Sequence, residues 1–198
     1  MKDVVIAENI DELKTWQKGV SDPYFILGKG SNSVINPQGK IRTVLQISPY
    51  FLPMTHAGAL FQCSAGVPVA KLMQYCQKHG LGGLEFCAGV PASVGGMIAM
   101  NFGCWGFEIS KYVQKVYILD SHNNEKWIPK EDMLFGYRRS IVQDQPWIIL
   151  GATFKLEETT PESVRSTIHQ RISERSDKQP LKAKTFGSIF KNPASDFA

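Results

Sequence analysis

The sequence has few of the residues that build metal sites and disulfide frameworks. Its 198 residues include four cysteines, and none of them forms a C-x-x-C pair or lies at zinc-ligand spacing from a histidine. This scarcity excludes the common zinc modules, so we expect no metal site. We interpret Cys63, Cys76, Cys87 and Cys104 as reduced and mostly buried thiols. A structural disulfide is the alternative, and it would require an oxidising compartment.

Long apolar runs and clusters of one charge are also missing. No apolar run approaches the roughly 18 residues that a membrane-spanning helix needs, and the stretch "MKDVVIAENIDELK" is too charged for a secretory signal. The 22 basic and 18 acidic side chains leave a mild net charge of +4, spread along the chain. We therefore expect a cytoplasmic protein that contacts neither membrane nor nucleic acid and that suits an anionic small molecule. The sequence leaves the oligomeric state open.

Apolar residues make up 43% of the chain, which is enough to bury a core without disulfide bonds. In residues 1–45 their pattern predicts a small β-α-β unit. It consists of a strand over residues 3–7, a helix and a strand over residues 24–27. Asn9 is expected to cap the helix with Glu12 as its capping-box partner, and Gly19 to end it.

Further along the chain, strands and helices follow one another without an internal repeat. We expect a strand over residues 59–65, a helix from Val69 that Gly80 ends, a hairpin of residues 113–120 and 125–129, a strand over residues 147–157, and a helix that starts at Thr160-Pro161. Paired strands mixed with helices indicate the α+β class rather than a regular doubly wound sheet.

The stretch "LGKGSNSVI", residues 27–35, places a glycine turn at the end of a predicted strand. Closely spaced backbone N–H groups in such a turn can hold phosphate oxygens. The pattern is not G-x-G-x-x-G, and the residues after it read as extended, so it does not predict a Rossmann site. A plain turn between strands is the alternative.

A second glycine-rich segment, "GLGGLEFCAGVPASVGGMIAMNFGCWG" at residues 80–106, is apolar where a flexible linker would be polar. Glycines among large apolar residues indicate that the backbone closely approaches something. Within the segment, "PASVGG" predicts backbone N–H groups without partners and a short helix from Ala92-Ser93 that points at an anion. A buried structural turn is the alternative.

Two further stretches carry polar groups that suit a ligand. "FGYRRS", residues 135–140, offers two arginines, one of which suits a carboxylate or phosphate, with a solvated surface pair as the alternative. "TFGSIFKNPASDFA", residues 185–198, includes Ser188 beside a glycine. No G-x-S-x-G elbow supports a nucleophile, but a serine can give its proton to a strong base such as an enolate in a dry site. An ordinary Gly-Ser turn is the alternative there.

Together and in this order, the motifs resemble those of the UDP-N-acetylenolpyruvoylglucosamine reductases (UDP-N-acetylmuramate dehydrogenases, MurB). "LGKGSN" is similar to the family's L-G-x-G-S-N, and "GLEFCAGVPASVGGMIAMNFGCWG" to its G-L-E-F-x-x-G-I-P-G-x-V-G-G followed by N-A-G-A-Y-G. "YRRS" is similar to Y-R-x-S, and "QPLKAKTFGSIFKNP" to Q-P followed by G-S-x-F-K-N-P. The resemblance runs from residue 3 to residue 198.

The resemblance implies a vanillyl-alcohol-oxidase-like (PCMH-type) FAD-binding fold with an incomplete C-terminal substrate domain. It divides the chain into a small β-α-β FAD-binding subdomain at residues 1–48, a larger α+β FAD-binding subdomain at residues 49–160 and a partial substrate-binding domain at residues 161–198. It also implies that NADPH reduces the FAD. The flavin then passes a hydride to the enolpyruvyl ether of UDP-N-acetylglucosamine, which gives UDP-N-acetylmuramate for cell-wall peptidoglycan.

By the same resemblance, the two glycine motifs contact the FAD, mostly through backbone N–H groups on the diphosphate. The implied FAD contacts are Gly28, Gly30, Ser31, Asn32, Gly89, Pro91, Ser93, Gly95, Gly96 and Asn101. Tyr137 and Arg138 are implied to bind the substrate, with Arg138 against its carboxylate and the developing enolate. Ser188 is implied to protonate the enolate carbon, and Asn192 matches a substrate-binding asparagine. A fixed guanidinium at the point where negative charge develops suits this chemistry.

The chain departs from the family pattern at several positions. Ala92 replaces a glycine, and Phe102, Cys104 and Trp105 stand where the family prefers alanine, alanine and tyrosine. The resemblance further implies a stretch before the first residue, and a continuation after the last that carries a catalytic glutamate. Two alternatives remain: a truncated relative that binds flavin without turning over substrate, and another flavin oxidase of the same superfamily.

Overall fold

The structure is a computed structural model that describes residues 3–36, 38–39, 41, 43–179 and 190–192. Its helices are α1 (Ile10–Gly19), α2 (Val69–His79), α3 (Val94–Ala99) and α4 (Pro161–Lys178), with short 3-10 turns η1 (Glu85–Cys87), η2 (Ile109–Lys111), η3 (Lys130–Met133) and η4 (Ile141–Gln143). Its strands are β1 (Asp3–Ala7), β2 (Tyr24–Ile26), β3 (Thr43–Ile47), β4 (Thr55–Ala57), β5 (Leu60–Ser64), β6 (Leu81–Gly82), β7 (Gly103–Cys104), β8 (Phe107–Glu108), β9 (Val113–Leu119), β10 (Glu125–Pro129), β11 (Ile148–Lys155) and β12 (Glu157–Glu158).

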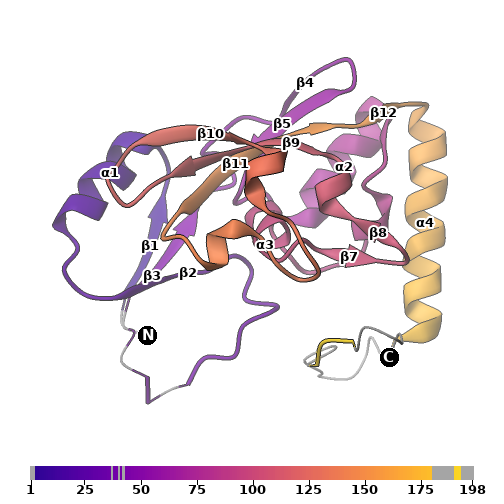
Figure 1. Cartoon of the computed structure of the whole chain (residues 1–198). Coiled ribbons are helices and arrows are strands. Elements are labelled where there is room, and N and C mark those ends of the chain that lie inside the picture. The colour runs from indigo at the N-terminus through magenta and orange to yellow at the C-terminus, as the bar shows by residue number, and fades with distance from the viewer. Residues whose placement is uncertain (1–2, 37, 40, 42, 180–189, 193–198) are drawn as a thin grey trace.

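A small N-terminal sheet has the parallel order β1-β3-β2, with α1 beside it (Figure 1). The predicted β-α-β unit is confirmed. Asn9 caps α1, because its Oδ1 accepts the Glu12 N–H at 3.0 Å. The sequence pattern did not predict β3, which fills the central position of this sheet. Its Leu45 is buried, with 0% of its surface exposed.

The larger sheet has the antiparallel order β10-β9-β11-β5-β4. The predicted hairpin is confirmed as β9 and β10, and the predicted strand at residues 59–65 as β5. The strand expected over residues 147–157 is β11, which ends at Lys155, and Glu157–Glu158 form the separate strand β12, which pairs with β6 instead.

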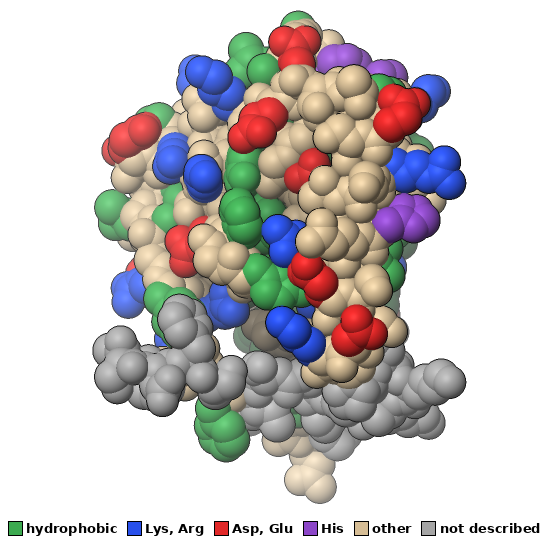
Figure 2. All heavy atoms as spheres, turned by 90° about the vertical axis from the view of Figure 1, so that its right-hand side faces the viewer, with side chains coloured by type: hydrophobic (Ala, Val, Ile, Leu, Met, Phe, Trp, Pro, Cys, Tyr) green, Lys and Arg blue, Asp and Glu red, His purple; other side chains and the backbone are tan. Residues whose placement is uncertain are grey.

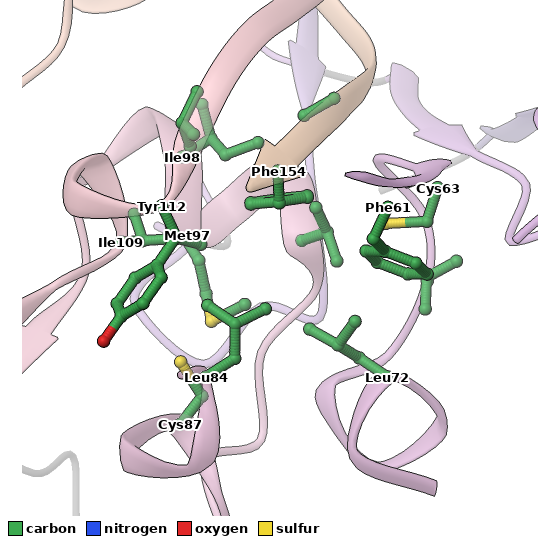
Figure 3. Close-up of a cluster of buried hydrophobic side chains, with 14 of the residues drawn as sticks. Phe61, Cys63, Leu72, Leu84, Cys87, Met97, Ile98, Ile109, Tyr112 and Phe154 are labelled. Carbon is green, nitrogen blue, oxygen red and sulfur yellow. The ribbon is translucent and has the colours of Figure 1, made fainter. Parts of the chain in front are cut away.

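Two hydrophobic cores hold these layers together. The smaller core joins the N-terminal sheet and α1 to the ends of β9 and β11, through Ala7, Leu13, Leu45, Leu119, Ile148 and Leu150. The larger core includes Phe61 and Phe154 of the five-stranded sheet, Leu72 of α2 and Met97 of α3 (Figure 3). Burying a large apolar side chain contributes about 1.5–3 kcal/mol, so these cores fix α2 and α3 against the sheet.

Helix α4 packs on the larger core, at the right-hand side of Figure 1. It begins as the sequence predicts, with Pro161 in its first turn and Thr160 Oγ1 accepting the Ser163 N–H at 3.1 Å. Its Val164 and Ile168 are buried in the same core cluster as the residues of α2. The helix that was expected to open a partial substrate domain therefore shares its core with residues 49–160.

Figure 2 shows the face that α4 presents, where acidic and basic side chains are interspersed around a stripe of hydrophobic ones. Cys63, Cys76 and Cys87 are buried and Cys104 is half-buried, as predicted for thiols. Within the described ranges, no helix combines the length and the apolar character that crossing a membrane would require.

Candidate functional site

The first glycine turn leaves the small sheet at the end of β2. Gly30 has a φ of +74°, a left-handed conformation that favours glycine. Gln46 of β3 donates from Nε2 to Gly28 O at 3.1 Å, which fixes the start of the turn. The backbone N–H groups of residues 28–32 have no acceptor among the residues that the structure describes. The turn therefore presents five successive backbone donors.

The second glycine segment contains the short helix that the sequence predicts. Ser93 is the N-cap of α3, and its Oγ accepts the Gly96 N–H at 3.4 Å. One face of the helix packs against the larger core, where Val94, Met97 and Ile98 are buried. Packing thus holds this helix along its whole length.

The prediction of partnerless N–H groups in "PASVGG" is wrong for the first turn of α3. The Val94 N–H donates to Val67 O at 3.0 Å, and the Gly95 N–H donates to Ala65 O at 2.8 Å. Both acceptors belong to the loop after β5, which passes close to the start of the helix. A Cβ on Gly95 would lie 2.9 Å from Ala65 Cβ, so packing accounts for this glycine. The start of α3 is a packing element, and its donors are already used.

The two glycine motifs meet at Gly28 and Ser93. A Cβ on Gly28 would lie 2.4 Å from Ser93 Oγ, closer than real side-chain contacts come. The same Cβ would lie 3.9 Å from Gly96 Cα. A side chain at position 28 would therefore require Ser93 Oγ to move. The contact brings together two motifs that lie far apart in the sequence.

The residues at this junction fit the diphosphate of a dinucleotide. Successive N–H donors around a left-handed residue form a concave array that binds anions. Glycine at positions 28 and 30 leaves the backbone open to a close approach, and the Lys29 side chain is exposed beside it. Ser31 and Asn32, also implied FAD contacts, lie in the same turn and are exposed.

Gly89 and Pro91, two more implied FAD contacts, precede α3 on the exposed surface. Gly89 has a φ of +79°, and a Cβ there would lie 3.3 Å from Arg175 Cδ of α4. Arg175 also donates from Nε to Ala88 O at 3.2 Å. The structure thus places Gly89 against α4, whereas Ser93 and Gly96 lie at the first glycine turn.

Sequence reasoning did not single out a cluster of two arginines on α4 and one tryptophan. The guanidinium carbons of Arg171 and Arg175 lie 5.1 and 4.7 Å from the ring centroid of Trp105. These are cation–π distances, and the four-residue spacing of the arginines puts them on one face of the helix. Burial raises the pKa of the neighbouring Cys104 thiol above its usual value, and the Arg175 guanidinium opposes this shift. The cluster fastens α4 to the second glycine segment.

Asn101 lies at the opposite end of α3 from Ser93. Its side chain is 0% exposed. Its Nδ2 donates to Glu108 Oε2 and to Gly136 O, both at 3.0 Å, and its Oδ1 accepts the Ser110 N–H at 3.2 Å. Both donors and the oxygen of this side chain, which the resemblance implies as an FAD contact, therefore already have protein partners.

The "FGYRRS" motif forms a tight turn with Tyr137 and Arg138 at its tip. The Gly136 N–H donates to Arg139 O at 3.0 Å, and the Arg139 N–H donates to Gly136 O at 3.1 Å. Arg139 pairs with Asp144 at 2.6 Å. Arg138 has no acidic partner among the described residues, and its guanidinium carbon lies 5.2 Å from the Tyr137 ring centroid. The structure thus distinguishes two arginines that the sequence left equivalent.

The last described residues reach the same turn. The backbone N–H of Asn192 donates to Tyr137 Oη at 3.1 Å, which brings the "FKNP" and "YRRS" motifs together. Ser188, the implied proton donor, lies outside the described residues. The structure therefore assembles two adjoining groups around α3: the glycine turn at Ser93, and the Tyr137-Arg138 turn at Asn101.

Comparison with known proteins shows the family of this chain. The chain matches the model of a family described as FAD binding domain over residues 2–124. The UDP-N-acetylenolpyruvoylglucosamine reductase of Alkaliphilus oremlandii is 33% identical over 98% of this chain and 65% of its own length. The protein of the same name from Bacillus pumilus is 34% identical over 98% of this chain and 66% of its own length. The chain thus spans 65–66% of these two relatives.

Solved structures give the same fold. UDP-N-acetylenolpyruvylglucosamine reductase (MurB) from Thermus caldophilus superposes with a TM-score of 0.83 at 29% identity, covering 98% of this chain and 70% of that chain. An alkyldihydroxyacetonephosphate synthase superposes with a TM-score of 0.56 at 15% identity, covering 78% of this chain and 31% of that chain, a likeness that shows the fold alone. The predicted α+β, PCMH-type FAD-binding fold is confirmed.

Proposed function

The chain belongs to the FAD binding domain family, and on this premise we propose that it is the flavin-binding part of a UDP-N-acetylenolpyruvoylglucosamine reductase. The proposed reaction reduces the enolpyruvyl ether of UDP-N-acetylglucosamine to UDP-N-acetylmuramate, a peptidoglycan precursor, with NADPH as the reductant. One observation carries the proposal: the glycine turn with five backbone donors lies against the start of α3, where a Cβ on Gly28 would meet Ser93 Oγ at 2.4 Å.

The chain's own residues would hold the cofactor through its phosphates. The N–H groups of residues 28–32 would donate to the diphosphate, and Ser93 and Gly96 would form the adjoining wall. When bound, FAD would supply the hydride chemistry that side chains lack. We further propose that residues 1–48 and 49–160 are the two FAD-binding subdomains. Residues 161–198 would begin the substrate-binding part, anchored by the buried face of α4.

Arg138 would bind the carboxylate of the substrate. Reduction of the vinyl carbon leaves negative charge on the neighbouring carbon and the carboxylate, and a planar guanidinium donates two parallel hydrogen bonds to such a group. The pairing of Arg139 with Asp144 supports this choice between the two arginines. Ser188 would give its proton to the enolate carbon, and Tyr137 and Asn192 would help to bind the substrate.

The flavin site is tested by a matched pair of glycine substitutions. Gly28→Ala should weaken FAD binding at least about tenfold, equivalent to about 1.4 kcal/mol, because the added Cβ would meet Ser93 Oγ at 2.4 Å. Gly19→Ala is the control, since a Cβ there meets nothing within 4 Å. Titration of the purified chain with FAD, followed by flavin fluorescence, measures both affinities. A wild-type chain that binds no FAD, or two variants of equal affinity, would contradict the proposed site.

The reaction is tested on the FAD-loaded chain in two half-reactions. NADPH should bleach the flavin absorbance, and the enolpyruvyl ether should restore it. Arg138→Ala should slow the restoration about 100-fold or more, the usual effect of removing a group that stabilises developing charge. Arg139→Ala is the control, because its pair with Asp144 is 60% and 51% exposed and weak for that reason.

Other results would favour the alternatives. Bleaching that the enolpyruvyl ether fails to reverse would indicate a flavin-binding chain that does not turn over this substrate. Rapid restoration by oxygen alone would indicate another flavin oxidase. Loss of restoration in Arg139→Ala but not in Arg138→Ala would reverse the assignment of the two arginines.

A further inference from the structure

Arg138 has a backbone conformation that needs support from its surroundings. Its φ is +56°, in the left-handed region, while Tyr137 before it is outside that region. A two-residue turn with positive φ at the second central position has the type II pattern, which favours glycine there. An arginine in this place is strained unless neighbouring groups hold the turn.

Two side chains hold the carbonyl groups of the turn. Asn101 donates from Nδ2 to Gly136 O at 3.0 Å. Gln143 donates from Nε2 to Arg138 O at 3.1 Å, and also to Ala99 O at 3.1 Å. Asn101 and Ala99 both belong to the C-terminal end of α3 and the turn that follows it. The Tyr137-Arg138 turn is therefore fastened to the end of this helix.

Three partners determine the orientation of the Asn101 amide. Glu108 Oε2 and Gly136 O, at 3.0 Å each, require donors, whereas the Ser110 N–H, at 3.2 Å, requires an acceptor. Reversing the amide would set its oxygen against two acceptors and its nitrogen against a donor. Asn101 also has a φ of +40°, which asparagine adopts more readily than most residues. Glu108 thus acts on the turn through Asn101.

The same helix reaches the first glycine turn at its other end. Ser93, the N-cap of α3, lies against Gly28. The helix has six residues, which corresponds to about 9 Å at the usual rise per residue. Its buried face in the larger core prevents it from shifting (Figure 3). One short rigid element therefore joins the turn at residues 28–32 to the turn that carries Arg138.

We propose that Asn101, oriented by Glu108, is a positioning residue that fixes the Arg138 turn relative to the glycine turn at residues 28–32. Asn101 acts through Gly136 O and touches neither the substrate nor the cofactor. The consequence for catalysis rests on the proposed function, whereas the fixing of the turn does not. Loss of Asn101 should loosen the turn and slow only the step that uses Arg138.

The direct test is hydrogen exchange of the turn. Asn101→Asp keeps the size of the side chain, removes both donors and sets a carboxylate against Glu108. The Arg139 amide, which donates to Gly136 O, should then exchange at least about tenfold faster, while the buried amides of β9 and β11 exchange as in the wild type. An Arg139 exchange rate equal to that of the wild type would overturn the proposal.

A second variant guards against misfolding of the first. Glu108→Ala removes the acceptor that orients Asn101 and should also speed Arg139 exchange. Glu108→Gln keeps an oxygen acceptor at this position and should restore the wild-type rate. Exchange that is unchanged in Glu108→Ala, or equally fast in Glu108→Gln and Glu108→Ala, would overturn the orienting role of Glu108.

The functional readout separates positioning from general damage. In FAD-loaded Asn101→Asp, reduction by NADPH should stay within about twofold of the wild type, and restoration by the enolpyruvyl ether should slow about tenfold, equivalent to about 1.4 kcal/mol. Equal slowing of both half-reactions would overturn the proposal. If the wild-type chain binds no FAD, the proposed function fails, and the exchange experiment still decides whether Asn101 fixes the turn.

Discussion

The two glycine-rich regions of the chain differ in whether their backbone N–H groups have acceptors among the described residues. At residues 28–32, Gly30 has open space around it, and the N–H groups lack acceptors among the described residues. In the segment 80–106, Gly83 and Gly103 leave no room for a Cβ, and the first N–H groups of α3 have backbone acceptors. The first region thus leaves its backbone donors available to the proposed ligand, whereas the start of α3 uses its first donors in packing. Glycine density alone does not distinguish the two roles, whereas the partners of the N–H groups do.

The largest effect is expected from disrupting the packing of the glycine-rich segment at residues 80–106. Gly83 has a φ of +113°, and a Cβ there would lie 2.5 Å from Tyr112 Cε1. Gly83→Ala should lower the free energy of unfolding by about 3 kcal/mol, from backbone strain and overpacking together. Gly106→Ala is the control, with a φ of +77° but nothing within 4 Å, and it should cost about 1 kcal/mol. Urea unfolding of both variants without FAD measures the difference, and equal costs would show that packing does not fix this segment.

A medium effect tests the contact between the two regions. Ser93→Ala removes the Oγ, so the nearest atoms to a Cβ on Gly28 become Ser93 Cβ at 3.7 Å and Gly96 Cα at 3.9 Å, both ordinary contacts. The loss of FAD affinity in Gly28→Ala should therefore shrink to about threefold or less in the Ser93→Ala background. The coupling between the two positions is then at least about 0.7 kcal/mol, within the range typical of residues in contact. Losses that simply add in the double variant would mean that the two motifs do not touch.

The smallest effect concerns the chemistry of the cysteine thiols. Burial raises the pKa of Cys76 to about 12, and it also raises the pKa of Cys63. At pH 8 both thiols stay protonated and shielded, so half-buried Cys104 should react first with a thiol reagent, and Cys104→Ser should abolish this first phase. Added FAD should change that rate by less than about twofold, because the proposed diphosphate donors lie at residues 28–32. Strong protection of Cys104 by FAD would contradict the proposal that FAD binds mainly at residues 28–32.

Much of the fold follows from short stretches of sequence. Asn9 caps α1, Thr160 caps α4, and Gly80 ends α2 with a left-handed φ of +62°, as the residue types predict. These signals are local, because each cap bonds to groups within a few residues of itself. β3 was missed because its place between β1 and β2 depends on pairing with two strands distant in sequence.

For the candidate site too, the sequence predicted some features and the structure alone revealed others. The order of the four motifs points to the FAD binding domain fold, which the comparisons show. The motifs did not reveal that Ala65 and Val67 carbonyls occupy the first donors of α3. They also gave no sign that Asp144 pairs with Arg139 and leaves Arg138 without an acidic partner among the described residues.

The sequence by itself determined which residues can adopt special conformations and which motifs occur together, because these depend on side-chain type and local spacing. Only the tertiary structure decided which backbone donors find acceptors among the described residues, which of the two arginines pairs with Asp144, and that the Asn101 side chain bonds to Glu108, Gly136 and Ser110. The physical reason is that a polar group becomes available or occupied according to its partners. Most of those partners, such as Ser93 for Gly28 and Gly136 for Asn101, arrive from distant parts of the chain.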